Sequence, residues 1–152
     1  MARILIVDDV EIVRKALQLG VQKMGHEADG ASDPYQALEL ARLHPPDLAL
    51  VDYRMPGMDG VAFFETMRAA LGPRCPTVLF ISATPADEVR RKLAPRGLQP
   101  CGFVRKPFHL EDLWKLLEDA LAACAAMPAR GPGLRTPGVG LRASLQSARG
   151  AA

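Results

Sequence analysis

Short apolar runs alternate with helical patterns five times along this chain, and that alternation constrains its fold more than any other feature. Four runs are strongly apolar: ILIV (4–7), LALV (48–51), TVLFI (77–81) and GFV (102–104). Runs without polar alternation are typical of strands covered on both faces, as in a parallel sheet. A fifth run, HEADGAS (26–32), stands where another strand is due. Because it is only weakly apolar, we expect it at an edge of the sheet.

Helical patterns occupy the intervals between these runs. Asp33, followed by a proline and then by Gln36, predicts the start of the second helix. Thr84 and Asp87 give a similar capping signature for the fourth helix, which Pro95 should end. Apolar residues at helical spacing predict the other three helices, over about 13–24, 61–71 and 110–121. The repeated β-α order indicates an α/β fold with a doubly wound, five-stranded parallel sheet.

The composition changes at about residue 125. Residues 125–152 are mostly Ala, Gly, Pro, Ser and Arg without sustained periodicity, so we expect one domain over 1–124 and a disordered basic tail. The tail holds four arginines and no acid, which leaves 15 basic against 17 acidic residues for the domain. Because the domain is mildly acidic, we expect it not to bind DNA directly.

The N-terminal sequence and the cysteines bear on the compartment. MARILIVDD (1–9) reaches acids after only a few apolar positions, so we expect no signal peptide and no membrane insertion. Cys75, Cys101 and Cys124 are odd in number and follow no metal-ligand spacing, which favours reduced structural thiols. Both observations predict a cytoplasmic protein.

Polar side chains follow four of the predicted strands, at the point where each strand ends. Asp8 and Asp9 follow the first and Asp52 ends the third, while Ser82 and Lys106 follow the fourth and fifth. Because ligands of open parallel sheets bind at the carboxyl ends of the strands, we expect these groups to converge. Three neighbouring carboxylates repel one another unless a cation lies between them. Hard oxygen ligands of this kind suit Mg²⁺.

A carboxylate in such a cluster can act as a nucleophile toward a phosphoryl group and form an acyl phosphate. The metal and Lys106 would then neutralise the phosphoryl oxygens, since electrostatics and positioning carry most of phosphoryl transfer. Asp52 is the best candidate for the nucleophile. It ends a central strand, between the acid pair and the side that carries Ser82 and Lys106.

This set of motifs resembles the receiver domain of two-component response regulators. The resemblance rests on the acid pair 8–9, VDYRMPGMDG (51–60), FISAT (80–84) and FVRKPF (103–108), and it covers about residues 2–123. It implies a flavodoxin-like fold and phosphorylation of Asp52 by a histidine kinase or a histidine phosphotransfer protein. It also implies no enzyme activity beyond self-catalysed phosphoryl transfer and autodephosphorylation.

The resemblance further implies roles for single residues. Asp9, Asp52 and the main-chain carbonyl of Arg54 would ligate Mg²⁺, and Asp8 would act largely through water. Ser82 and Lys106 would contact the phosphoryl group, and the peptide bond after Lys106 would be cis.

A switch is implied as well. Phosphorylation would draw the Ser82 hydroxyl inward and leave space into which Phe103 can rotate. The surface of the fourth helix, fifth strand and fifth helix would then change shape and be recognised by an unknown protein partner. Arg54 and Thr84 stand where the family borders the path of the hydrolytic water, so they should modulate the lifetime of phospho-Asp52. Asp59, in contrast, is expected only to cap the third helix.

Two other functions compete with this interpretation. One is a phosphorylation-independent binding module that keeps the receiver fold as a scaffold. The other is a haloacid-dehalogenase-type phosphatase, which needs a second acid two residues after its nucleophile, where this chain has Arg54. Within the favoured interpretation we expect a stand-alone, chemotaxis-type regulator that acts by docking a protein.

Overall fold

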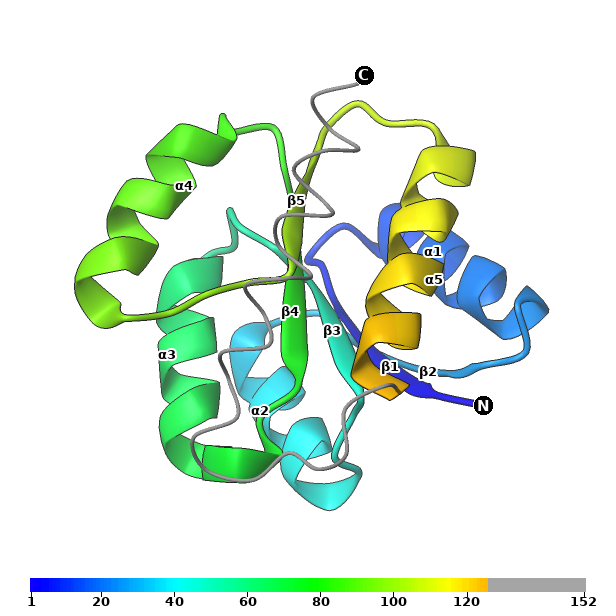
Figure 1. Ribbon diagram of the computed structural model, residues 1–152, viewed down its shortest axis with the longest axis horizontal. Coiled ribbons are helices and arrows are strands. Elements are labelled where there is room, and N and C mark those ends of the chain that lie inside the picture. Colours follow the sequence, from blue (N-terminus) through cyan, green and yellow to red (C-terminus); the bar gives the residue numbers. More distant parts are fainter. Residues whose placement is uncertain (126–152) are drawn as a thin grey trace.

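A computed structural model describes residues 1–125, and the predicted tail beyond them lies outside the described residues. Five parallel strands form one sheet in the order β2-β1-β3-β4-β5 (Figure 1). The strands are β1 (Arg3–Val7), β2 (Glu27–Ala31), β3 (Leu48–Asp52), β4 (Thr77–Ser82) and β5 (Gly102–Arg105). The helices are α1 (Glu11–Lys23), α2 (Pro34–Leu43), α3 (Gly60–Leu71), α4 (Ala86–Leu93) and α5 (Leu110–Ala125). The predicted α/β class, the doubly wound parallel sheet and the positions of its five strands are confirmed.

Helices cover both faces of the sheet, and the side chains of each strand alternate between two cores. In β1, Leu5 and Val7 join the core beneath α2, α3 and α4, whereas Ile4 and Ile6 face α1 and α5. Figure 1 shows this division, with α1 and α5 on one side of the sheet and the other three helices on the opposite side. Burial on both faces explains why the central strands are continuously apolar between their end residues.

The edge position predicted for the second strand is confirmed, because β2 pairs only with β1. Asp33 caps α2, accepting a hydrogen bond of 2.8 Å from the backbone N–H of Gln36. The Gln36 side chain accepts from the N–H of Ser32 at 3.0 Å, one residue before the cap. Asp59 caps α3 as predicted, with the N–H of Ala62 at 2.8 Å.

The capping prediction for α4 is wrong. The helix begins at Ala86 after Pro85, and no side chain caps it. Thr84 lies in a turn, where its N–H donates to the Ser82 hydroxyl oxygen at 2.9 Å. The predicted end is confirmed: α4 stops at Leu93, and Pro95 follows in a short 3₁₀ turn. Among the described helices, none combines the length and the apolar character needed to cross a bilayer.

Candidate functional site

The polar residues predicted to converge do meet at the carboxyl edge of the sheet. Asp52 and Ser82 are the last residues of β3 and β4, and Lys106 directly follows β5. Asp8 and Asp9 directly follow β1, the strand beside β3. The order of strands reverses direction between β1 and β3, so the loops after these strands diverge and leave the edge open there.

The three acids form a compact cluster. Asp8, Asp9 and Asp52 each offer a carboxylate oxygen, and these oxygens lie within 4.8 Å of one another. Asp8 is 1% exposed and Asp52 is 7% exposed, whereas Asp9 is open to solvent. One oxygen of Asp8 accepts from the N–H of Val10 at 2.9 Å, and the other is buried with no hydrogen-bond partner among residues 1–125. A buried carboxylate oxygen in this position could serve as a ligand of a bound cation.

Lys106 supplies the positive charge of the cluster. Its Nζ lies 3.5 Å from Oδ2 of Asp52 and 3.6 Å from Oδ2 of Asp8. Its backbone N–H donates to the carbonyl of Ser82 at 2.8 Å, which fixes the lysine against the end of β4. The predicted cis peptide bond between Lys106 and Pro107 is present. The ammonium group therefore pairs with two of the three carboxylates of the cluster.

The ionisation of Asp52 reflects its burial and the charges around it. Burial raises the pKa of Asp52 to about 6, against an ordinary value of 3.8. Lys106 lowers the pKa, the charges of Asp8 and Asp9 raise it, and a backbone hydrogen bond from Arg54 lowers it. The net rise in the pKa comes chiefly from burial, and the charges of Asp8 and Asp9 add to it. A divalent cation bound at the cluster would favour the charged form of Asp52. The set of hard oxygen donors fits Mg²⁺.

The predicted switch residues occupy the side of the site toward α4. Ser82 is 5% exposed, and its hydroxyl oxygen faces the turn at Thr84. Phe103 is half-buried on β5, with its ring stacked at 6.0 Å on Phe80. The guanidinium of Arg90 on α4 lies 4.7 Å from the Phe103 ring centroid. The structure thus places Ser82 at the end of the strand beside β3 and Phe103 against Arg90 of α4, and their proposed movement stays a prediction.

Sequence reasoning missed two cations of α4 that approach this region, Arg90 and Lys92. Lys92 lies against Tyr53, the residue after Asp52, and against Asp59. Nothing local in the sequence identifies these partners. The burial of Val89 and Leu93 sets which side of α4 faces the core, and the positions next to them on the helix could have drawn attention to Lys92.

The parallel sheet and the acid cluster at its carboxyl edge define a class of protein, the receiver domains of two-component signalling. The chain belongs to the response regulator receiver domain family, whose model matches residues 4–118.

The chain is similar to curated and solved members of that family. It is 31% identical over 113 residues to the virulence transcriptional regulatory protein PhoP of Salmonella typhimurium, covering 74% of this chain and 49% of that protein. PhoP of Escherichia coli K12 is 29% identical over 111 residues. The chain thus spans about half the length of the curated relatives it matches.

Among solved structures, chemotaxis protein CheY4 of Vibrio cholerae superposes with a TM-score of 0.72 at 28% identity, covering 79% of this chain and 98% of that one. NtrX of Brucella abortus superposes with a TM-score of 0.70, also at 28% identity, covering 82% of this chain and 28% of that one. A CheY-like receiver domain from Methanospirillum hungatei, at 21% identity and a TM-score of 0.73, shares the fold.

Proposed function

We propose that this chain receives a phosphoryl group on Asp52 from a histidine kinase or a histidine phosphotransfer protein, in a reaction that requires Mg²⁺. The bond between phosphorus and the donor's imidazole nitrogen breaks as a bond from phosphorus to a carboxylate oxygen of Asp52 forms. The supporting observation is the buried Asp52 carboxylate, 3.5 Å from one ammonium group and clustered with two further acids.

The residues around Asp52 take distinct parts in this reaction. Asp8, Asp9 and Asp52 would hold the metal together with the main-chain carbonyl of Arg54. When bound, Mg²⁺ supplies positive charge that neutralises phosphoryl oxygens. The ammonium of Lys106 lies close to both Asp8 and Asp52, so it can pair with a phosphoryl group on Asp52 from where it already lies. The transfer is self-catalysed by this site, in a domain whose family serves signalling.

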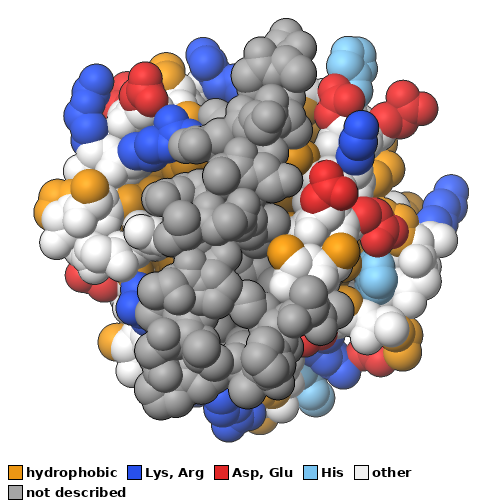
Figure 2. Space-filling model, viewed as in Figure 1, with side chains coloured by type: hydrophobic (Ala, Val, Ile, Leu, Met, Phe, Trp, Pro, Cys, Tyr) orange, Lys and Arg blue, Asp and Glu red, His pale blue; other side chains and the backbone are white. Residues whose placement is uncertain are grey.

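The phosphorylated state is read at the surface of α4, β5 and α5. Ser82 bonds a phosphoryl oxygen, and Phe103 moves toward the space that the hydroxyl leaves. This surface is charged: Figure 2 shows acidic side chains over α5, where Glu111, Asp112 and Glu118 are exposed. A protein partner that prefers one shape of this charged surface would receive the signal. Arg54 is exposed and Thr84 half-buried beside the site, and they set the lifetime of phospho-Asp52.

Incubation with acetyl phosphate tests the proposal directly. Intact-mass and peptide analysis should show one phosphoryl group on Asp52 with Mg²⁺, and none after chelation with EDTA. Asp52→Asn is the matched control and should gain no mass. Failure of the wild-type chain to gain mass would instead favour a receiver fold that binds partners without phosphorylation.

A further inference from the structure

Lys92 of α4 contacts both ends of the loop that joins β3 to α3, residues 53–59. Its Nζ lies 3.7 Å from Oδ2 of Asp59, the last residue of the loop. It also lies 5.6 Å from the ring centroid of Tyr53, the first residue of the loop, within the range of a cation–π contact. Tyr53 is 5% exposed and directly follows the phosphoacceptor Asp52. The side chain of Tyr53 and then the charge of Asp59 raise the pKa of Lys92, so the group stays cationic.

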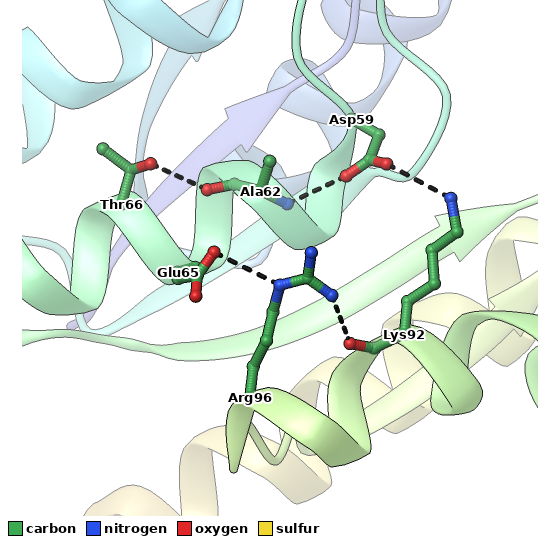
Figure 3. Close-up of polar contacts among 6 residues, drawn as sticks. All are labelled: Asp59, Ala62, Glu65, Thr66, Lys92 and Arg96. Carbon is green, nitrogen blue, oxygen red and sulfur yellow. Dashed lines mark hydrogen bonds and ion pairs between the residues drawn. The ribbon is translucent and has the colours of Figure 1, made fainter.

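Asp59 connects this lysine to α3 as well. Oδ1 of Asp59 accepts the hydrogen bond from the N–H of Ala62 that starts the helix, while Oδ2 faces Lys92 (Figure 3). The carboxylate is therefore more than the helix cap that the sequence predicts. It fixes the end of the loop to two helices at once.

A second set of contacts holds the same two helices together. Nε of Arg96, after α4, lies 3.2 Å from Oε1 of Glu65 on α3. Nη1 of Arg96 donates to the carbonyl of Lys92 at 2.6 Å. Figure 3 shows both sets side by side between the helices. Because Arg96 fixes the backbone of Lys92, the lysine side chain is presented to the loop from a defined position.

A shallow surface depression of about 410 Å³ lies where these groups meet. It is lined by Tyr53, Arg54, Met55, Pro56, Asp59 and Lys92. Five of these six residues belong to the loop, and the sixth is the lysine. The loop is therefore open to solvent on the side where Lys92 lies, while Tyr53 and Met55 are buried in the same core as α4.

We propose that Lys92 is a positioning residue for the phosphoacceptor site, holding loop 53–59 through Tyr53 and Asp59 in the shape that binds Mg²⁺. The inference rests on the proposed function, because that loop carries the Arg54 carbonyl assigned to the metal. It adds a direct connection between the loop and α4, separate from Ser82 and Phe103. If the contact of Lys92 with the loop favours Mg²⁺ binding, thermodynamic reciprocity requires that bound Mg²⁺ favours this contact and so stabilises α4.

The variant Lys92→Gln separates this idea from simple electrostatics because the two predict opposite signs. Loss of a nearby cation should by itself tighten Mg²⁺ binding. Loss of the positioning contact should weaken binding, by about two- to fivefold for a partly exposed pair. The dissociation constant is measured on the full chain from backbone amide NMR shifts during titration with MgCl₂. Arg91→Gln, which removes a cation from the adjacent position, is the matched control and should not weaken binding.

Two further variants isolate the contact with Asp59. Asp59→Asn keeps a good helix cap and removes the charge that faces Lys92. If the two residues act together, the double variant should weaken Mg²⁺ binding by less than the product of the single effects. Lys92→Arg, which keeps the charge, should retain more of the affinity than Lys92→Gln.

Hydrogen exchange measures the connection to α4. Mg²⁺ should slow exchange of α4 amides in the wild-type chain and should have little effect on them in Lys92→Gln. A wild-type chain that binds no Mg²⁺ and gains no phosphoryl group overturns the proposed function itself. A competent wild type with Lys92→Gln binding Mg²⁺ equally or more tightly overturns only the role of Lys92. Equal weakening by Arg91→Gln would also overturn it.

Discussion

At the residue scale, the surroundings of Asp52 oppose the charged form that the proposed nucleophile needs. The carboxylate is buried beside two other acids, and a single lysine approaches it at 3.5 Å. Burial and like charge both favour the neutral acid, while nucleophilic attack needs the anion. A bound cation would resolve this conflict, because the negative charges that oppose ionisation of Asp52 would also attract the metal.

Stability should therefore depend on the ionisation of Asp52 when no metal is present. The folded-state pKa of about 6 exceeds the ordinary 3.8, so the folded state binds more protons than the unfolded state between these values. Unfolding free energy should accordingly fall as pH rises from 4 to 6, by up to about 3 kcal/mol from this group. Urea unfolding in EDTA should show Asp52→Asn to be more stable than wild type at pH 7, with the difference lost near pH 4. A constant difference across this range would contradict the assignment.

Lys106 should matter for transfer more than for binding the metal. Its ammonium lies between Asp8 and Asp52, where phosphoryl oxygens would arrive. Lys106→Met keeps the apolar stem and removes the charge, and should slow phosphorylation by acetyl phosphate by about 10². The rate is followed by intact mass at saturating Mg²⁺. Retention of the wild-type rate would show that the metal alone neutralises the transferred group.

At the scale of elements, the start of α3 is packed directly against the backbone of the acceptor strand. A Cβ on Gly60 would lie 2.8 Å from the carbonyl oxygen of Asp52 and 2.9 Å from the Phe80 ring. Gly60→Ala should therefore shift the end of β3, destabilise the fold by about 1–3 kcal/mol and weaken Mg²⁺ binding as well. Gly20→Ala is the control, since its Cβ would meet Trp114 at 2.1 Å on the other face of the sheet. It should lower stability and leave Mg²⁺ affinity unchanged, as measured by urea unfolding and NMR titration.

The elements also show what sequence can and cannot predict. Strands buried on both faces appear in the sequence as continuous apolar runs. The number of strands, their parallel arrangement and the acids at their ends could therefore be predicted. Thr84 is wrongly predicted to cap α4, because a threonine before Pro-Ala-Asp fits the capping pattern. In the structure its backbone N–H donates to the Ser82 hydroxyl oxygen in a turn before the helix. The contacts of Lys92 could not be predicted, because they depend on how α4 packs beside α3 and not on any local pattern.

At the scale of the whole molecule, two separate cores meet at one functional edge. The sheet divides α1 and α5 from α2, α3 and α4, and the acid cluster lies where strands from the middle of the sheet end. One connection between the site and α4 runs through Phe103, because the guanidinium of Arg90 on α4 lies 4.7 Å from the centroid of the Phe103 ring. Through Lys92 the site reaches the same helix by way of the loop after β3. A change at Asp52 can thus bias α4 through two sets of contacts.

Metal binding should stabilise the molecule as a whole, because the acid cluster forms only when β1 and β3 are paired. A ligand that binds the folded state at about 100 times its dissociation constant adds about 2.7 kcal/mol to the unfolding free energy. For a domain of this size that is on the order of ten degrees in Tm. Calorimetric scans across a MgCl₂ series should show this rise and its reversal by EDTA. The double variant Asp9→Asn with Asp52→Asn should melt at one temperature throughout the series. An equal rise in this variant would mean that Mg²⁺ binds elsewhere, and an unchanged wild-type Tm would mean that the acids, although gathered at one edge, do not hold it.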